Sequence, residues 1–195
     1  MICPRRLLLI VVVTLSGLNA TAQDSPFVRD LVNEHNIVRK KHGLKPFHYN
    51  HLLSQAAQAH AEWMATERNM VHLQPDAKNL EDFRTCGHHP LNRVIRTGYL
   101  EWDDVFRIEV NDGQQAVVPL EDANSLVGEN IAEAKDAGHP AQQTRLMIDG
   151  WMNSPGHRHA ILTPEFKEIG IGTACTNEQD YDTYWCVVFA RPLEK

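Results

Sequence analysis

The stretch Gly150-Trp151-Met152-Asn153-Ser154-Pro155-Gly156-His157-Arg158-His159-Ala160-Ile161-Leu162 organises the chain, because two predicted helices meet within it. The segment from Pro140 onward has the apolar spacing of one amphipathic helix face. Ser154 followed by Pro155 is the pattern of an N-cap and a first helical residue, so a second helix is expected to start there. His157 then lies in the first turn, where the helix dipole favours a neutral imidazole. His157 is therefore a candidate ligand, although a histidine there could equally cap its helix or pack in the core.

The first 22 residues have the three parts of a secretory signal. Arg5-Arg6 is the basic start, Leu7 to Val13 is the apolar run, and Ala20-Thr21-Ala22 is the cleavage site. No run in the chain is long enough for a membrane span, so we expect residues 23–195 to be secreted or periplasmic as one domain. Loss of the two arginines changes the formal net charge from −6 to −8. An acidic chain without a basic run argues against nucleic-acid binding.

Three cysteines remain after Cys3 leaves with the signal, namely Cys86, Cys175 and Cys186. Cys175 and Cys186 lie on two candidate strands near the C-terminus that look like a hairpin. An oxidising compartment favours disulfides. The sequence therefore predicts a Cys175–Cys186 bridge, with Cys86 free or paired with another molecule.

Two amphipathic helices are expected near the start of the mature chain, from Ser25-Pro26 to Gly43 and from about Asn50 to Arg68. His60 lies on the apolar face of the second helix, where a hydrogen-bonded core histidine is the favoured interpretation. His72 follows that helix, and taken alone it is an ordinary loop residue.

The middle of the chain, from residue 74 to residue 125, carries weaker patterns. Leu91 to Thr97 is a candidate short helix that ends at Gly98. Asn111-Asp112-Gly113 lies between two apolar runs and indicates a hairpin. We interpret residues 100–120 as a hairpin insertion in the same domain.

Two later runs are candidate strands. Val127 to Ala132 carries Glu129 near its start, where a glutamate is usually solvated. Gly170-x-Gly172 lies within a strand near the C-terminus and lacks the rest of a nucleotide-binding fingerprint.

Four motifs together resemble one family, in that family's order. They are His35-Asn36-x-x-Arg39-x-x-His42-Gly43-x-x-Pro46, Gly128-Glu129-Asn130-Ile131-Ala132, Trp151 to Leu162, and Tyr184-Trp185 to Phe189. They look like the signatures of the CAP superfamily, which holds cysteine-rich secretory proteins, antigen 5 and plant pathogenesis-related proteins. Ser154-Pro155-Gly156-His157-Arg158 is similar to the form in short bacterial members. The likeness spans Phe27 to Pro192, except between Gln74 and Leu126.

The resemblance implies an α+β fold, a three-layer α-β-α sandwich with a small antiparallel sheet. It also implies a cavity lined by two histidines and two acidic residues. These positions fall on His72, Glu129 and His157, while Ser154 stands where the second acid is found. The remaining triad is also seen in the bacterial branch. Ala160 is a smaller departure, because the bacterial pattern usually has asparagine there.

Two neutral imidazoles and a carboxylate are a donor set for Zn²⁺ or a similar divalent ion, so His72, Glu129 and His157 are the candidate metal ligands. Three protein ligands would leave a position open for water or substrate. The same residues could instead act without a metal as a general acid–base pair. No nucleophile motif accompanies them.

Three functions remain open. The first is an extracellular binding module for a divalent metal, a lipid or another small ligand, which the family's association with sterol and lipid binding favours. The second is a metal-dependent or His/Glu-dependent extracellular hydrolase. The third is a protein-interaction module with a vestigial cavity, in which the insertion binds a partner protein. We favour the binding module, with no enzymatic activity assigned.

Overall fold

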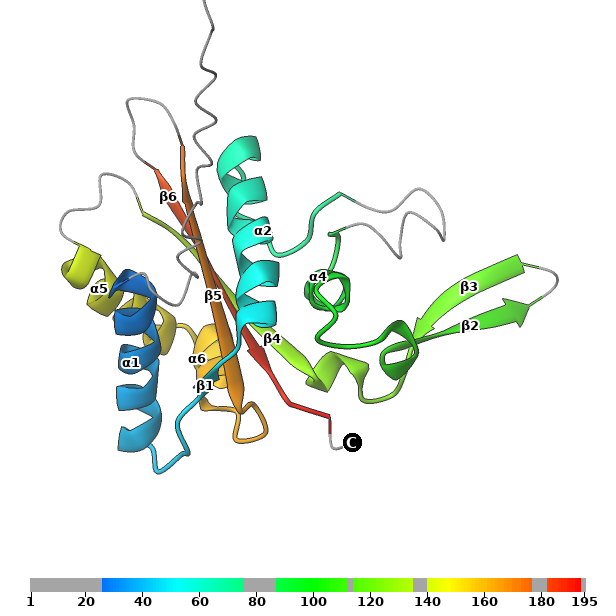
Figure 1. The fold of residues 1–195 in the computed structure, drawn as a ribbon, viewed down its shortest axis with the longest axis horizontal. Helices are drawn as coiled ribbons and strands as arrows, with labels where there is room; N and C mark the ends of the chain where they lie inside the picture. Colours follow the sequence, from blue (N-terminus) through cyan, green and yellow to red (C-terminus); the bar gives the residue numbers. More distant parts are fainter. Residues whose placement is uncertain (1–25, 76–86, 112–113, 135–139, 177–181, 194–195) are drawn as a thin grey trace, which may run out of the picture.

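The computed structural model describes residues 26–75, 87–111, 114–134, 140–176 and 182–193 (Figure 1). The predicted export signal and Cys86 lie outside these residues. The helices are α1 (Pro26–Lys41), α2 (His51–Glu67), α4 (Pro90–Arg96), α5 (Pro140–Asn153) and α6 (Pro155–Leu162), with the 3₁₀ turns η2 (Trp102–Asp104) and η3 (Ala123–Ser125). The strands are β1 (His48–Tyr49), β2 (Phe106–Asn111), β3 (Gln114–Pro119), β4 (Val127–Ala134), β5 (Glu168–Cys175) and β6 (Thr183–Ala190).

The main sheet has four strands in the order β1-β5-β6-β4. Strand β6 pairs antiparallel with both β5 and β4, whereas the two-residue β1 runs parallel to β5. Strand β6 is buried along its whole length, and its side chains alternate between two cores. Tyr184, Cys186 and Val188 face the core that α2 covers, and Trp185, Val187 and Phe189 face the core that α1 and α5 cover. This arrangement confirms the predicted α-β-α sandwich.

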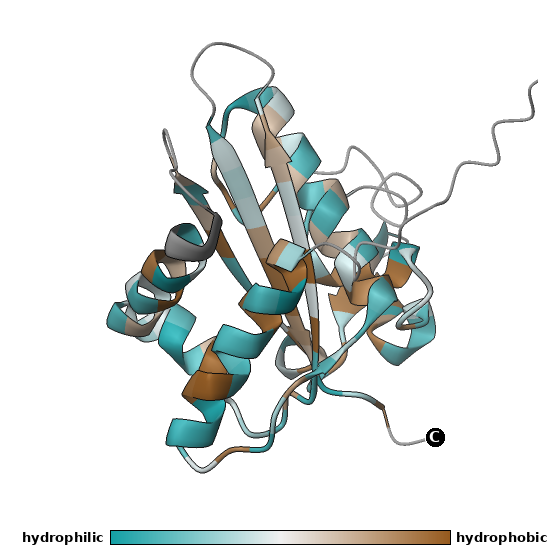
Figure 2. Cartoon of the chain, turned by 60° about the vertical axis from the view of Figure 1, so that its left-hand side comes forward, coloured by the Kyte–Doolittle hydropathy of each residue, from teal (hydrophilic) through white to brown (hydrophobic). Residues whose placement is uncertain are grey.

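The layers are visible in both views of the chain. Helix α2 lies on one side of the sheet, and α1, α5 and α6 lie on the other (Figure 1). Hydrophilic and hydrophobic residues alternate along the helices, as expected for helices with one apolar face (Figure 2). Among the described residues, no helix has the length and apolar composition needed to cross a membrane.

The hairpin predicted around Asn111 is present as β2 and β3, which pair antiparallel with Asn111 opposite Gln114. The two strands form a separate sheet that extends away from the body of the domain, beyond α4 (Figure 1).

Helix α4 begins at Pro90, and Gly98 after it has a positive φ of 76°, as expected for a glycine that ends a helix.

Helix α2 packs directly on β5 because two residues of that strand have no side chain. A Cβ at Gly170 would lie 2.1 Å from the carbonyl carbon of Leu53, and a Cβ at Gly172 would lie 2.2 Å from the backbone nitrogen of Gln58. The Gly170-x-Gly172 pair therefore serves close contact between the helix and the sheet.

Two side chains of α2 also complete the outer edge of β5. The Ser54 hydroxyl accepts from the backbone N–H of Ile171 at 2.8 Å. The Gln58 amide accepts from the N–H of Thr173 at 3.0 Å and donates to the carbonyl of Thr173 at 2.9 Å. Gln58 thus takes the place of a neighbouring strand at this position.

Two residues of α1 stabilise the layer of helices on the side of the sheet opposite α2. Asn36 accepts from the N–H of Phe47 at 2.7 Å and donates to its carbonyl at 3.1 Å. The buried Arg39 guanidinium lies 3.9 Å from the centroid of the Phe47 ring. Its nitrogens donate to four backbone carbonyls, those of Lys45, Ile161, Thr163 and Phe166, at 2.7–3.1 Å. Arg39 therefore ties α1 to the end of α6 and to the turn before β5.

The predicted Cys175–Cys186 disulfide is wrong, because both thiols are free. The register of β5 and β6 places Cys175 opposite Thr183 and Cys186 opposite Gly172. The two cysteines are thus three residues apart along the hairpin, which is ~10 Å at the rise of an antiparallel strand. A disulfide requires Cα atoms closer than about 7 Å.

Candidate functional site

Glu129 is the buried centre of the candidate site. It lies on the edge strand β4, and its side chain is 2% exposed. One carboxylate oxygen accepts from Nδ1 of His72 at 3.0 Å, and the other accepts from Nη2 of Arg93 at 2.6 Å. Burial alone would raise the pKa of Glu129, but the Arg93 guanidinium and the hydrogen bond from His72 lower it to about 2. Glu129 is therefore ionised at neutral pH.

His72 lies in the segment after α2, and its side chain is 45% exposed. Because an ionised carboxylate only accepts hydrogen bonds, the Nδ1 atom of His72 must carry the proton that Glu129 receives. In the neutral ring, Nε2 is then the nitrogen with a free lone pair. His72 thus combines a fixed ring with an accessible acceptor.

His157 lies in the first turn of α6, as the sequence predicted. Ser154 is the N-cap residue and Pro155 follows it, but the Ser154 side chain accepts no capping hydrogen bond. The ring centroids of His157 and His72 are 6.3 Å apart. Burial and the neighbouring His72 lower the pKa of His157, which keeps its ring neutral near pH 7. The structure thus places His72 in contact with Glu129 and near His157.

His60 is a hydrogen-bonded core histidine, as predicted. It is fully buried, and its Nε2 donates to the carbonyl of Val71 at 2.9 Å while Nδ1 accepts from the Gln74 amide at 3.1 Å. Burial lowers its pKa to about 4, although Glu129 acts in the opposite direction. His60 also lies 3.8 Å from Glu129, so it forms part of the wall behind the carboxylate.

Arg93 is a residue of the site that the sequence did not predict. It lies on α4 and is 3% exposed. Its guanidinium donates to Glu129 and to the carbonyls of Gly87, His88 and His72. The sequence contains one indication of this role. Arg93 lies between the apolar residues Leu91 and Val94 of a short helix, and an arginine buried with such neighbours needs an acceptor.

The donors that fit a divalent ion here are fewer than the sequence suggested. Among the described residues, no three His, Cys, Asp or Glu side chains form a group that could hold a metal ion. Both oxygens of Glu129 are already engaged by His72 and Arg93. Glu129 therefore acts here as the carboxylate that orients the His72 ring, and the predicted set of three ligands is not assembled in the described residues.

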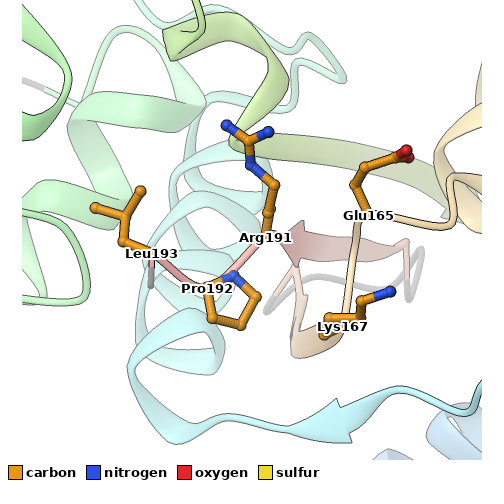
Figure 3. A pocket seen from close by; sticks show the side chains of 5 residues that line it. All are labelled: Glu165, Lys167, Arg191, Pro192 and Leu193. Atoms are coloured by element: carbon orange, nitrogen blue, oxygen red, sulfur yellow. The ribbon is translucent and has the colours of Figure 1, made fainter. Parts of the chain in front are cut away.

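Two cavities border the segments that carry these residues. One, of about 700 Å³, has Val127, Gly128 and Phe166 in its wall and reaches the residue next to Glu129 on β4. A second, of about 500 Å³, includes Val71 and Leu73, the neighbours of His72. A further cavity, also of about 500 Å³, lies between the turn before β5 and the segment after β6 (Figure 3). Its walls are formed by Glu165, Lys167, Arg191, Pro192 and Leu193.

Two solved structures share the fold. An outer surface protein from Borrelia burgdorferi aligns with a TM-score of 0.56 and 16% identity, over 87% of this chain and 95% of that one. An extracellular protein containing an SCP domain from Bacillus anthracis aligns with a TM-score of 0.54 and 22% identity, over 85% of this chain and 40% of that one.

Sequence relatives and the family model agree with this fold. YkwD of Bacillus subtilis is 27% identical over 154 residues, which are 79% of this chain and 45% of YkwD. The membrane protein YlbC of the same organism is 27% identical over 137 residues, 70% of this chain and 28% of YlbC. The chain thus spans less than half the length of both relatives. The sequence model of the cysteine-rich secretory protein family matches residues 32–189. With four motifs, one fold and a match over most of its length, this chain belongs to the cysteine-rich secretory protein, or CAP, family.

Proposed function

We propose that the chain is a secreted binding module whose ligand contacts His72 and His157 above the buried Glu129. The observation that carries this proposal is the hydrogen bond from His72 to Glu129 at 3.0 Å. A carboxylate behind an imidazole fixes the ring, selects its tautomer and raises the basicity of the outer nitrogen. Export is proposed from the signal pattern of the first 22 residues.

Zn²⁺ or a similar divalent ion is the candidate ligand. The imidazoles of His72 and His157 would hold it, and Glu129 would orient the first of them. When bound, the ion would supply Lewis-acid polarisation of a coordinated oxygen. The chain itself supplies a fixed ring, a buried negative charge and a compensating guanidinium. The cavity of about 700 Å³ beside Gly128 supports the alternative of a lipid or another small molecule, because pockets of that size hold such ligands.

Direct nucleophilic catalysis has little support from the described residues. Cys186 is the thiol in the site, where its sulfur donates to Glu129 at 3.4 Å. Burial and the adjacent Glu129 raise the pKa of the Cys186 thiol, so it stays protonated and is a poor nucleophile. The hydrolase alternative would therefore have to rely on water activated by a metal or by the histidines.

Zinc titration by calorimetry on matched variants tests the proposal. His72→Ala and His157→Ala should each abolish most of the binding, because each removes one ligand. Glu129→Gln should weaken binding by about 10–100-fold, since it removes a carboxylate behind a ligand. His159→Ala is the control, because His159 is an exposed histidine two residues beyond His157. Unchanged affinity in both His72→Ala and His157→Ala would rule out the metal site.

Protein binding by the β2–β3 hairpin is a second candidate function, and one observation favours it. Ile108 and Val110 are 38% and 62% exposed on the hairpin that extends from the domain. Replacing both by serine should abolish binding of a partner protein recovered by cross-linking. Leu146→Ser is the matched control, because Leu146 is 72% exposed on α5. Equal recovery with both variants would exclude the hairpin.

A further inference from the structure

We propose that Arg93 is the positioning residue of this site and that it assembles the His72–Glu129 pair without a metal ion. The inference rests on the proposed function for what the site binds. The positioning of His72 and Glu129 by Arg93 involves only residues of this chain, so it can be measured without any ligand.

A single nitrogen of Arg93 joins the two parts of the pair. Nη2 donates to the Glu129 carboxylate at 2.6 Å and to the backbone carbonyl of His72 at 3.1 Å. The other oxygen of Glu129 accepts from the ring of His72 at 3.0 Å. The three residues therefore close a ring of hydrogen bonds. Arg93 binds the main chain of His72 and the carboxylate of Glu129, and that carboxylate accepts a hydrogen bond from the His72 side chain.

The second terminal nitrogen of Arg93 fixes the other end of the guanidinium. Nη1 donates to the carbonyl of Gly87 at 2.6 Å and to that of His88 at 3.3 Å, just before α4. The planar fork is thus held at both tips, which a lysine could not reproduce because its ammonium is a single point. The orientation of Arg93 is set by α4, and Glu129 and His72 take their positions from it.

The charges of Arg93 and Glu129 depend on each other. Both side chains are 2% exposed, and a buried charge without a partner is strongly unfavourable. Arg93 supplies the positive charge beside Glu129 that a metal ion would otherwise have to supply. The pair is therefore complete in the protein alone.

Arg39 shows what a purely structural buried arginine looks like in the same chain. It is also fully buried, and its acceptors are four backbone carbonyls. None of those carbonyls belongs to His72, Glu129 or His157. Arg93 differs because one acceptor is the site carboxylate and another is the backbone of His72. Arg39 is therefore the matched control for loss of a buried guanidinium.

Arg93→Lys tests the proposal because it keeps the charge and removes the fork. The nitrogen-15 resonances of the His72 ring, recorded in protein treated with a chelator, report its tautomer. The wild-type protein should show the form protonated at Nδ1, and Arg93→Lys should show a mixture of tautomers. Arg39→Lys should lower the thermal midpoint and leave the His72 resonances unchanged. Zinc affinity should fall about 10–100-fold in Arg93→Lys, as for other residues that orient a ligand.

The outcomes separate this inference from the proposed function. If zinc does not bind the wild-type protein but the His72 tautomer still depends on Arg93, the binding proposal fails and the positioning role stands. If Arg93→Lys changes neither the tautomer nor the zinc affinity, the positioning role is overturned.

A second measurement covers the case in which Arg93→Lys does not fold. In the metal-free wild-type protein, the terminal nitrogens of Arg93 should give separate resonances, because both are held. One averaged resonance would show a freely rotating guanidinium and would overturn the proposal.

Discussion

Asn130 donates through its side-chain amide to the backbone carbonyl of His157 at 3.2 Å, which holds the first turn of α6 against β4. Glu129, the preceding residue, faces the opposite side of the sheet and accepts from His72 and Arg93. Two successive residues of one edge strand thus hold the two histidines from opposite faces. The alternation of side chains along a strand makes this arrangement possible.

Asn130→Asp should destabilise the protein and weaken zinc binding. The change keeps the shape of the side chain but replaces the buried donor with an acceptor that faces the carbonyl of His157. Loss of a buried hydrogen bond and burial of a charge should lower the free energy of unfolding by about 3 kcal/mol. Urea denaturation measures this value. Asn124→Asp is the control, because Asn124 is exposed in η3, and an equal loss in that variant would contradict the explanation.

Gly170→Ala and Gly172→Ala should each lower the free energy of unfolding by more than about 2 kcal/mol. A Cβ at either position would meet the backbone of α2 at 2.1–2.2 Å, and helix backbone cannot move as a side chain can. Gly150→Ala should instead stabilise α5 by up to about 1 kcal/mol, because nothing lies within 4 Å of a Cβ there. Urea denaturation of the three variants should show these opposite signs. A neutral effect at both strand positions would refute the close-packing argument.

The two described cysteines should react as free thiols with different accessibility. In a Cys86→Ser background, Cys175 should react with a thiol reagent in the native protein, because it is exposed. Cys186 should react only after unfolding, because it is buried and burial raises the pKa of its thiol. A reducing agent should leave the thermal midpoint unchanged. A peptide map that joins Cys175 to Cys186 would contradict the strand register.

His35 should make stability depend on pH between about 6.5 and 4. The ring is fully buried, and burial lowers its pKa from 6.5 to about 4, so the folded protein keeps it neutral in this range. The unfolded chain binds a proton below pH 6.5, and stability therefore falls as the pH decreases, by up to about 3 kcal/mol at pH 4. Above pH 6.5 this loss of stability is absent, because the His35 ring is neutral in both the folded and the unfolded state.

Replacing His35 with phenylalanine should remove this part of the pH dependence. The ring has the aromatic neighbours Phe47, Trp151 and Phe189, so phenylalanine suits the site. Urea denaturation at pH 8 and at pH 4.5 should show a smaller difference for His35→Phe than for the wild type. An identical difference in the two proteins would show that His35 does not take up the proton.

The start of α6 could be predicted from the sequence because a local pattern determines it, whereas the three layers were predicted from the family resemblance. Ser154 and Pro155 mark the helix start, and the alternation along β6 determines which side chains face each core. Local patterns could not show whether Cys175 and Cys186 form a disulfide, because that depends on the register between β5 and β6. Two cysteines on neighbouring strands are close only if the pairing places them opposite each other.

Arg93 could not be placed in the site from the sequence, for a related reason. Its acceptors come from the segment of His72, from the turn before α4 and from β4, and only tertiary packing brings these together. The contact of His72 with Glu129 came from the family resemblance and not from the residues alone. A short helix with one buried arginine gives no sign of which carboxylate it will meet.

The side chains of Ser54 and Gln58 have a consequence for self-association. An uncovered strand edge is a template on which a second chain can add a strand. At Ile171 and Thr173 this template is already occupied, because α2 supplies the donors and acceptors that an incoming strand would offer. The sheet has two edge strands, the two-residue β1 and the eight-residue β4, so β4 offers the longer edge to a copy of this chain. A strand added at β4 would lie beside Glu129, so assembly at that edge would cover the proposed ligand site.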